Sequence, residues 1–160
     1  MAELERTTMQ QSPMRVRQAG PADAPAVLRL VRDAYARWVP LIGREPLPMR
    51  VDYAQAAIAH DIALLERDGE LLALIETFAA PGHLFIENVA VAPTHQGQGL
   101  GRRMMALAEA EARAAGLGEL RLLTNAAFAA NVRLYQGLGF RIDRTEPYLA
   151  GTTVFMSKVL

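Results

Sequence analysis

The sequence predicts one layered domain of the α/β or α+β class, with about four helices on a mixed, mostly antiparallel sheet of six to seven strands. Short apolar runs separated by turn signals are typical of strands. A long amphipathic segment near the centre lies between two such runs. A strand–helix–strand unit of this kind implies one parallel strand pair. The length of 160 residues suits a single core.

Composition and charge exclude several classes of function. Apolar residues make up 51% of the chain, charged residues 21%, and the formal net charge is zero, so no electrostatic footprint for nucleic acid is present. The absence of cysteine excludes a thiolate nucleophile, and the three histidines are scattered, so we expect no metal. No apolar run reaches the length of a membrane span, and the first thirteen residues are polar. We therefore expect a cytoplasmic protein that has no membrane partner.

The N-terminal part contains one strand and one helix. Residues 1–12 show little pattern, and we expect a flexible lead-in to a domain over residues 13–160. Met14–Ala19 alternates as a strand does, and apolar residues recur at helical spacing between Val27 and Tyr35.

The middle of the chain predicts a break followed by a meander of three antiparallel strands. Pro40–Tyr53 is too rich in proline for a long regular element, and a short helix should run from Tyr53 to about His60. Two apolar runs flank Asp68-Gly69, a pair that suits a hairpin turn. The third strand is Leu84–Val91.

The C-terminal part supplies the crossover. The helix Gly99–Ala115 ends at Gly116 and is followed by a strand over Glu119–Thr124. Asn125, at the end of this strand, is expected to cap a turn, and the alternative is that it reaches toward a ligand. A short helix closed by glycines and two further strands complete the chain.

The segment QGQGLGR, Gln96–Arg102, stands where the central helix begins. Backbone N–H groups in the first turn of a helix lack partners and carry the positive end of its dipole, and glycine lets the backbone approach a ligand. The segment can therefore hold a phosphate, with charge from Arg102 at its edge. The alternative is a turn needed only for tight packing. The spacing fits neither the dinucleotide fingerprint nor the P-loop.

The segment VAPTHQGQGLGRRMM resembles the acetyl-CoA-binding motif of the GCN5-related N-acetyltransferase (GNAT) family, [QR]-x-x-G-x-[GA]. The motif is matched by Gln96, Gly99 and Gly101. A six-residue pattern arises often by chance, but Leu120–Phe140 is similar to the next block of the family, and the order of elements agrees over about 145 residues. The resemblance implies the GNAT fold.

For the cofactor, the resemblance implies a site between two strands. In this family the fourth strand, here Leu84–Val91, splays from the fifth, here Glu119–Thr124, and the pantetheine arm of acetyl-CoA inserts between them. Backbone groups of the fourth strand would bind pantetheine, and the glycine segment would hold the pyrophosphate. The implied cofactor residues are Val89, Ala90, Val91, Gln96, Gly97, Gln98, Gly99, Leu100, Gly101, Arg102, Asn131 and Tyr135.

For catalysis, the resemblance implies roles for two side chains. Tyr135 matches the tyrosine that protonates the departing thiolate of coenzyme A, although it can also be a packed core residue. Glu87 is the candidate general base, directly or through a water, because a carboxylate within the apolar run LFIENVAV is unusual as a structural residue. Glu76 on the preceding strand is its rival. The N–H group of Val89 would polarise the carbonyl.

On the acceptor side, family members differ chiefly between the first two helices and in the last hairpin. The candidate residues in these segments are Trp38, Arg44, Tyr53 and Tyr148. Aromatic and apolar groups with an arginine suit a pocket for a small amine that bears a carboxylate. The alternative is a loop that only packs Trp38 and Met49 on the sheet.

The sequence thus predicts an acetyl-CoA-dependent N-acetyltransferase that acetylates a primary amine of a small molecule by direct attack in a ternary complex. Family habit suggests a homodimer. The alternatives are a coenzyme A-binding regulatory module without turnover, a protein N-terminal acetyltransferase, and an enzyme for longer acyl chains. The presence of both Tyr135 and Glu87 favours catalysis, since a degenerate member would be expected to lack one of them.

Overall fold

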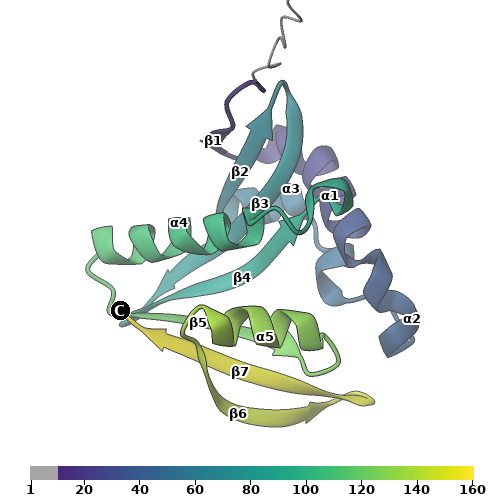
Figure 1. Ribbon diagram of the computed structural model, residues 1–160, viewed down its shortest axis with the longest axis vertical. Coiled ribbons are helices and arrows are strands. Elements are labelled where there is room, and N and C mark those ends of the chain that lie inside the picture. Colours follow the sequence, from purple (N-terminus) through teal and green to yellow (C-terminus); the bar gives the residue numbers. More distant parts are fainter. Residues whose placement is uncertain (1–10) are drawn as a thin grey trace, which may run out of the picture.

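The computed structural model describes residues 11–160, so the predicted lead-in lies outside the described residues except for its last two positions. Seven strands form one sheet in the order β1-β2-β3-β4-β5-β7-β6 (Figure 1). The pair β4–β5 is parallel and every other neighbouring pair is antiparallel, as the sequence predicted. The strands are β1 (Arg15–Gln18), β2 (Asp61–Arg67), β3 (Glu70–Ala80), β4 (His83–Val91), β5 (Glu119–Asn125), β6 (Arg141–Tyr148) and β7 (Gly151–Val159).

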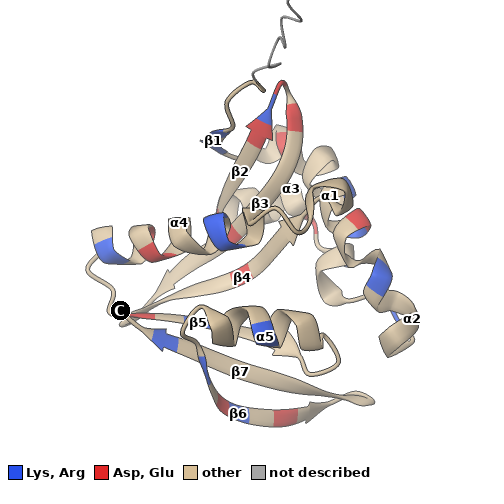
Figure 2. Ribbon diagram, viewed as in Figure 1, with Lys and Arg blue, Asp and Glu red and all other residues tan. Residues whose placement is uncertain are grey.

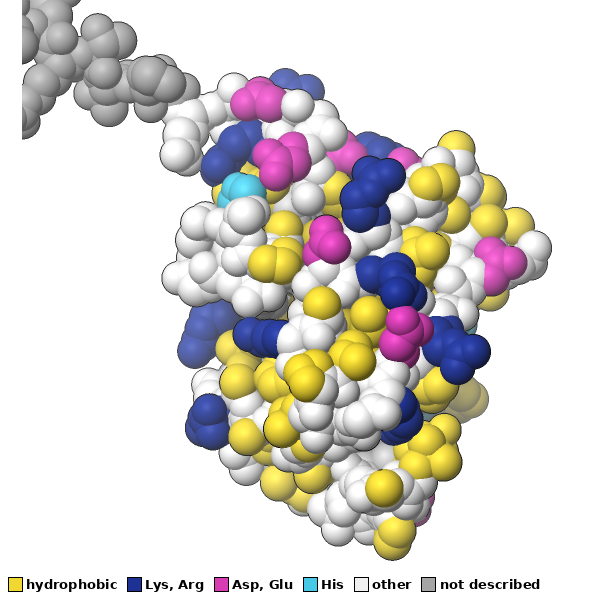
Figure 3. Space-filling model, turned by 90° about the vertical axis from the view of Figure 1, so that its right-hand side faces the viewer, with side chains coloured by type: hydrophobic (Ala, Val, Ile, Leu, Met, Phe, Trp, Pro, Cys, Tyr) yellow, Lys and Arg dark blue, Asp and Glu magenta, His cyan; other side chains and the backbone are white. Residues whose placement is uncertain are grey.

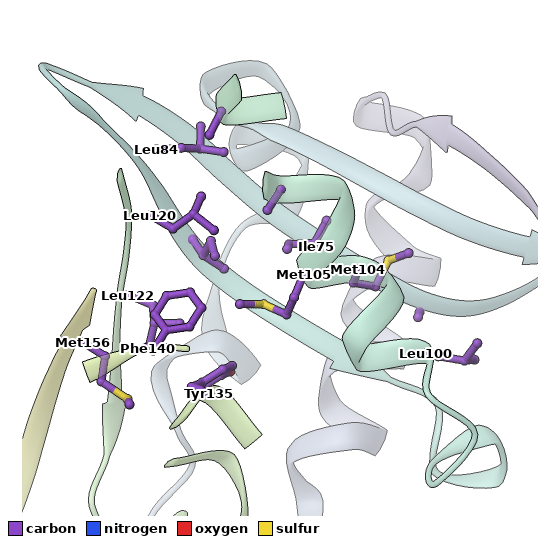
Figure 4. Packing of buried hydrophobic residues seen from close by; sticks show 14 of the residues in the cluster. Ile75, Leu84, Leu100, Met104, Met105, Leu120, Leu122, Tyr135, Phe140 and Met156 are labelled. Atoms are coloured by element: carbon purple, nitrogen blue, oxygen red, sulfur yellow. The ribbon is translucent and has the colours of Figure 1, made fainter. Parts of the chain in front are cut away.

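The helices cover both faces of the sheet. They are α1 (Ala24–Tyr35), α2 (Val39–Ile42), α3 (Tyr53–Ala59), α4 (Leu100–Ala114) and α5 (Ala129–Gly137). Buried side chains of α1 and α3 pack on β2, β3 and β4 in one cluster. Those of α4 and α5 form a second cluster with β3, β4, β5 and β7 (Figure 4). The sheet therefore lies between two hydrophobic layers.

The short helix α2 was not predicted. It is a single turn within the proline-rich segment, with proline in its first turn, where the missing N–H group costs nothing. Gly43 ends it in the left-handed conformation (φ +72°). The prediction that this segment holds no long regular element is confirmed, as are the four longer helices.

A β-bulge interrupts β4 at Glu87. In the pairing with β3, Asn88 lies opposite Glu76 and Ile86 lies opposite Thr77, so Glu87 has no opposite residue. The extra residue inverts the alternation of side chains. Ile86 packs in the α4 cluster, whereas Ala90, an even number of residues further, packs in the α1 cluster.

The strands β4 and β5 splay apart after a short contact. Their register covers three pairs only, from Leu84 with Leu120 to Ile86 with Leu122. Figure 1 shows the two strands together near the C-terminus and diverging toward α1. The splay begins at the bulge. Beyond Ile86, β4 stays paired with β3, but its other edge, which faces β5, has no neighbouring strand.

Charged side chains of both signs are interspersed over the elements (Figure 2). The side of the molecule at right in Figure 1 shows hydrophobic side chains between charged ones (Figure 3). Among residues 11–160, no helix combines the length and apolarity that a bilayer crossing requires. Because positive and negative residues are interspersed, surface charge does not mark a functional site, and the site has to be identified from local geometry.

Candidate active site

The turn before α4 contains two glycines in left-handed backbone. Gly97 has φ +76° and Gly99 has φ +79°, values that other residues rarely adopt. Gly101 lies inside the helix, where an added methyl group would make ordinary contacts with Leu134 and Val91. The first two glycines therefore allow the turn, whereas the third stands where a methyl group would fit at ordinary contact distances.

The N–H groups of Gly97–Arg102 have no acceptor within residues 11–160. The first helical bond runs from the Arg103 N–H to the Gly99 carbonyl oxygen, at 3.1 Å, and no described side chain caps the helix. Free N–H groups at the positive end of a fifteen-residue helix form an anion site. The turn therefore has the donor groups that a pyrophosphate requires.

A first cavity of about 410 Å³ extends from this turn along β4 to α5. Every cofactor residue expected from the family resemblance lines it, with the exception of Gln98. The structure thus brings together residues that lie as far apart in the sequence as Val89 and Tyr135.

The backbone N–H and C=O groups of β4 point alternately toward β3 and toward the gap between β4 and β5. Ala92 donates its N–H to β3 at 2.8 Å, and alternate residues of a strand face alternate sides, so Ala90 also faces β3. The backbone groups of Val89 and Val91 therefore face the gap. The side chain of Gln96 agrees, because its amide donates to the Val91 carbonyl at 3.2 Å.

A second cavity, of about 180 Å³, lies where β4 and β5 diverge. It meets the first cavity at four residues that line both: Tyr35 from α1, Val89 from β4, and Asn131 and Tyr135 from α5. We call these four residues the junction. The two cavities are therefore adjacent at these residues.

Tyr135 belongs both to the core and to the junction. Its side chain is 9% exposed, and its ring centroid lies 5.9 Å from that of Phe140 (Figure 4). Burial raises the pKa of the phenol to about 12, so the hydroxyl keeps its proton at neutral pH. Core packing and a functional hydroxyl are therefore compatible at this position.

Glu87 lines the second cavity from the bulge in β4. Although Glu87 is an exposed residue, its pKa is raised, chiefly by desolvation of the carboxylate at the cavity and further by the negative charge of Glu76, while His60 acts in the opposite direction. Glu76 is 3% exposed, lies 2.8 Å from the His60 Nδ1 and lines neither cavity. The geometry therefore favours Glu87 over Glu76 as a base.

The four candidate acceptor residues separate into two groups. Arg44 and Tyr148 line the second cavity, with the guanidinium carbon 5.7 Å from the phenol ring centroid. Trp38 lines the first cavity and stacks on Phe128 at 4.5 Å, and Tyr53 is buried and lines neither cavity. Of the four candidates, only Arg44 and Tyr148 thus line the second cavity.

Several residues of the site were not identified from the sequence. Tyr35 was interpreted only as an apolar position of a helix, and Asn88 was not singled out. The adjacent polar residues Glu87 and Asn88 within an apolar strand were a signal for the bulge. Asn125 does cap a turn as expected, since its side-chain oxygen accepts the Ala127 N–H at 2.9 Å. In residues 11–160, no three His, Asp or Glu side chains gather as a metal site would require.

Solved structures share this fold. PaiA N-acetyltransferase from Thermoplasma acidophilum, in complex with coenzyme A, superposes with a TM-score of 0.79 at 14% identity, over 92% of this chain and 99% of the other. The ribosomal-protein-S18-alanine N-acetyltransferase from Escherichia coli gives 0.75 at 22% identity, over 92% and 94%. Nourseothricin acetyltransferase gives 0.69 at 23%, over 91% and 98%. These identities support the fold alone.

The sequence itself also matches a known family. A search of curated proteins found no significant match. Residues 27–140, however, match the acetyltransferase (GNAT) family, and this range contains the bulged β4, the glycine turn, α4 and Tyr135. The chain therefore belongs to the GNAT family and is an acetyl-CoA-dependent acetyltransferase.

Proposed function

We propose that this protein transfers the acetyl group of acetyl-CoA to a primary amine of a small molecule, with the reaction taking place at the junction. The observation that carries the proposal is the meeting of the two cavities at Val89 and Tyr135, with Glu87 on the acceptor side. A thioester entering from the first cavity and an amine entering from the second would meet there.

The first cavity binds the cofactor in this proposal. The N–H groups of Gly97–Arg102 hold the pyrophosphate, and the backbone groups of Val89 and Val91 pair with pantetheine as an added strand would. Asn131 contacts the cofactor from α5. When bound, acetyl-CoA supplies a thioester whose carbonyl is open to attack.

The chemistry requires a base, an acid and a donor to the carbonyl oxygen. Glu87 takes a proton from the ammonium, directly or through a water, and the free nitrogen attacks the carbonyl carbon. The Val89 N–H, which faces the gap, polarises that carbonyl. As the C–N bond forms and the C–S bond breaks, Tyr135 gives its proton to the thiolate. The second proton released by nitrogen restores the phenol through solvent, and Glu87 gives the first proton to solvent, which regenerates the base.

Arg44 at the second cavity supports a small acceptor that bears a carboxylate, because its guanidinium can pair with that group. Among the structural neighbours, one is named for a ribosomal protein and one for nourseothricin, so the fold serves both kinds of acceptor. A protein N-terminus is therefore the alternative acceptor, and longer acyl donors are a further variant.

The experiment is a screen for release of the coenzyme A thiol. Acetyl-CoA is combined with small amines, amines that carry a carboxylate, and short peptides with free N-termini. Amine-dependent release with a small molecule supports the proposal, and release with peptides alone would assign a protein acceptor. Tight binding of coenzyme A without release for any acceptor would identify the silent regulatory module instead.

Two further expectations stay predictions. The first is a homodimer, which light scattering on the purified chain would test. The second is a cytoplasmic location, which fractionation of cells that express the protein would test. Neither affects the chemistry at the junction.

A further inference from the structure

A chain of hydrogen bonds connects the junction to a backbone carbonyl. The Tyr35 hydroxyl donates to the Asn88 side-chain oxygen at 2.6 Å. The Asn88 amide nitrogen donates to the Tyr53 hydroxyl oxygen at 3.3 Å, and Tyr53 donates to the Pro48 carbonyl at 2.7 Å. These contacts join α1, the bulged region of β4, α3 and the loop before it.

The Pro48 carbonyl fixes which group donates and which accepts in each of these hydrogen bonds. A carbonyl oxygen only accepts, so the single proton of the Tyr53 hydroxyl is committed to Pro48. The Tyr53 oxygen must then accept from the Asn88 amide nitrogen, which turns the Asn88 oxygen toward Tyr35. Tyr35 therefore has to donate its own proton to Asn88.

The consequence is that Tyr35 can offer only lone pairs to the junction. Tyr35 lines both cavities, and its hydrogen-bond partner Asn88 lines the second. Burial, followed by the nearby ionisable group of Tyr135, raises the pKa of Tyr35 well above its usual value. The two tyrosines of the junction thus differ, since the proton of Tyr35 is committed to Asn88, whereas we assign the proton of Tyr135 to the thiolate.

We propose that the Tyr35 hydroxyl oxygen accepts a hydrogen bond from the acceptor amine and thereby selects primary over secondary amines. This inference rests on the proposed function. A primary amine loses one N–H as the amide forms and keeps the other, and Tyr35 holds the one that remains. A secondary amine yields an amide with no N–H, which leaves the Tyr35 oxygen without a donor as the product forms. An acceptor left unpaired in a partly buried site opposes such a substrate.

The test compares two amines in two proteins. The most active primary amine of the screen and its N-methyl derivative are assayed with the wild-type chain and with Tyr35→Phe. The wild type should prefer the primary amine, and Tyr35→Phe should reduce the ratio of the two kcat/KM values by about three- to tenfold, the range expected for one hydrogen bond. The Kd of coenzyme A should stay within about twofold of the wild type, because phenylalanine keeps the ring that lines the first cavity and the backbone groups proposed to bind the cofactor lie on β4 and in the turn before α4.

A second variant tests whether Tyr53 orients the hydrogen bonds that reach Tyr35. Tyr53 lines neither cavity, yet Tyr53→Phe removes the anchor that orients Asn88 and should reproduce part of the loss of selectivity. The matched control is Thr77→Val, which removes a buried hydroxyl that donates to Glu111 on the other layer and should leave the ratio unchanged. An acetyl transfer that shows no amine dependence would contradict the proposed function. If the wild type is active and Tyr35→Phe leaves the ratio of the two kcat/KM values unchanged, whether activity is retained or falls equally with both amines, this inference alone is overturned.

Discussion

The two cavities that meet at the junction are built in different ways. The first takes more than half of its lining residues from one stretch, from Val89 on β4 to Arg102 on α4, which contains the glycine turn with its free backbone N–H groups. The second is assembled from side chains of separate segments, including α1, the loop after α2, β4, β5 and the last hairpin. A site made of backbone groups depends on conformation and changes little with side-chain identity. A site made of side chains can change its ligand by substitution, so we propose that the acceptor specificity of this chain lies in the second cavity.

The largest effect is expected where the two regions meet. Tyr135→Phe removes the proposed acid and should lower kcat by about 100-fold or more, the usual contribution of general acid catalysis. Because the ring stays in the core, the melting temperature and the Kd of coenzyme A should change little. Steady-state kinetics and calorimetry give these quantities. A collapse of cofactor affinity with kcat retained would make Tyr135 a structural residue.

The next largest effect concerns Glu87 on the acceptor side. A base acts only when it is deprotonated, and the raised pKa of Glu87 places the acidic loss of activity at a higher pH than for an ordinary carboxylate. Glu87→Gln should lower kcat/KM by about 10- to 100-fold and remove this acidic limb. The pH–rate profile of the variant decides the matter, and a limb that persists would eliminate Glu87 as the base.

The third prediction tests the backbone construction of the first cavity. Gly99→Ala forces a side chain into left-handed backbone, at a cost of about 1–2 kcal/mol, and should weaken coenzyme A binding about tenfold. Gly101→Ala is the matched variant, because its new methyl group meets the protein only at ordinary contact distances. It should preserve the melting temperature. Titration calorimetry that finds wild-type affinity in Gly99→Ala would refute the anion site at the turn.

The smallest effect is expected at the rim of the second cavity. Arg44→Ala should raise KM about three- to tenfold for amines that bear a carboxylate and leave other amines unaffected, because a charged hydrogen bond is lost. Arg144→Ala, which removes an arginine stacked on Phe155 outside this cavity, is the control. An equal change in KM for amines with and without a carboxylate would show that Arg44 does not bind the carboxylate.

The same contrast explains how much could be predicted from the sequence. The strands, the four longer helices and the splay follow from local periodicity, turn residues and the family motif. The bulge at Glu87 was not predicted. Its only sequence signal is the pair of adjacent polar residues Glu87 and Asn88, and such a pair does not show that the faces of the strand invert there. Nor could the bond between Tyr35 and Asn88 be foreseen, since the two residues are 53 positions apart. The glycine turn was predictable from local sequence and Tyr135 from the family resemblance, whereas a contact between two residues that match no motif was not.

The central claim is that acetyl transfer occurs at the junction of the two cavities. The measurement that tests it most directly is a crystal structure of the protein with acetyl-CoA. We predict the pyrophosphate on the N–H groups of Gly97–Arg102, pantetheine paired with Val89 and Val91, and the thioester sulfur within hydrogen-bonding reach of the Tyr135 hydroxyl. A thioester bound away from Tyr135, with the second cavity closed off from it, would contradict the account.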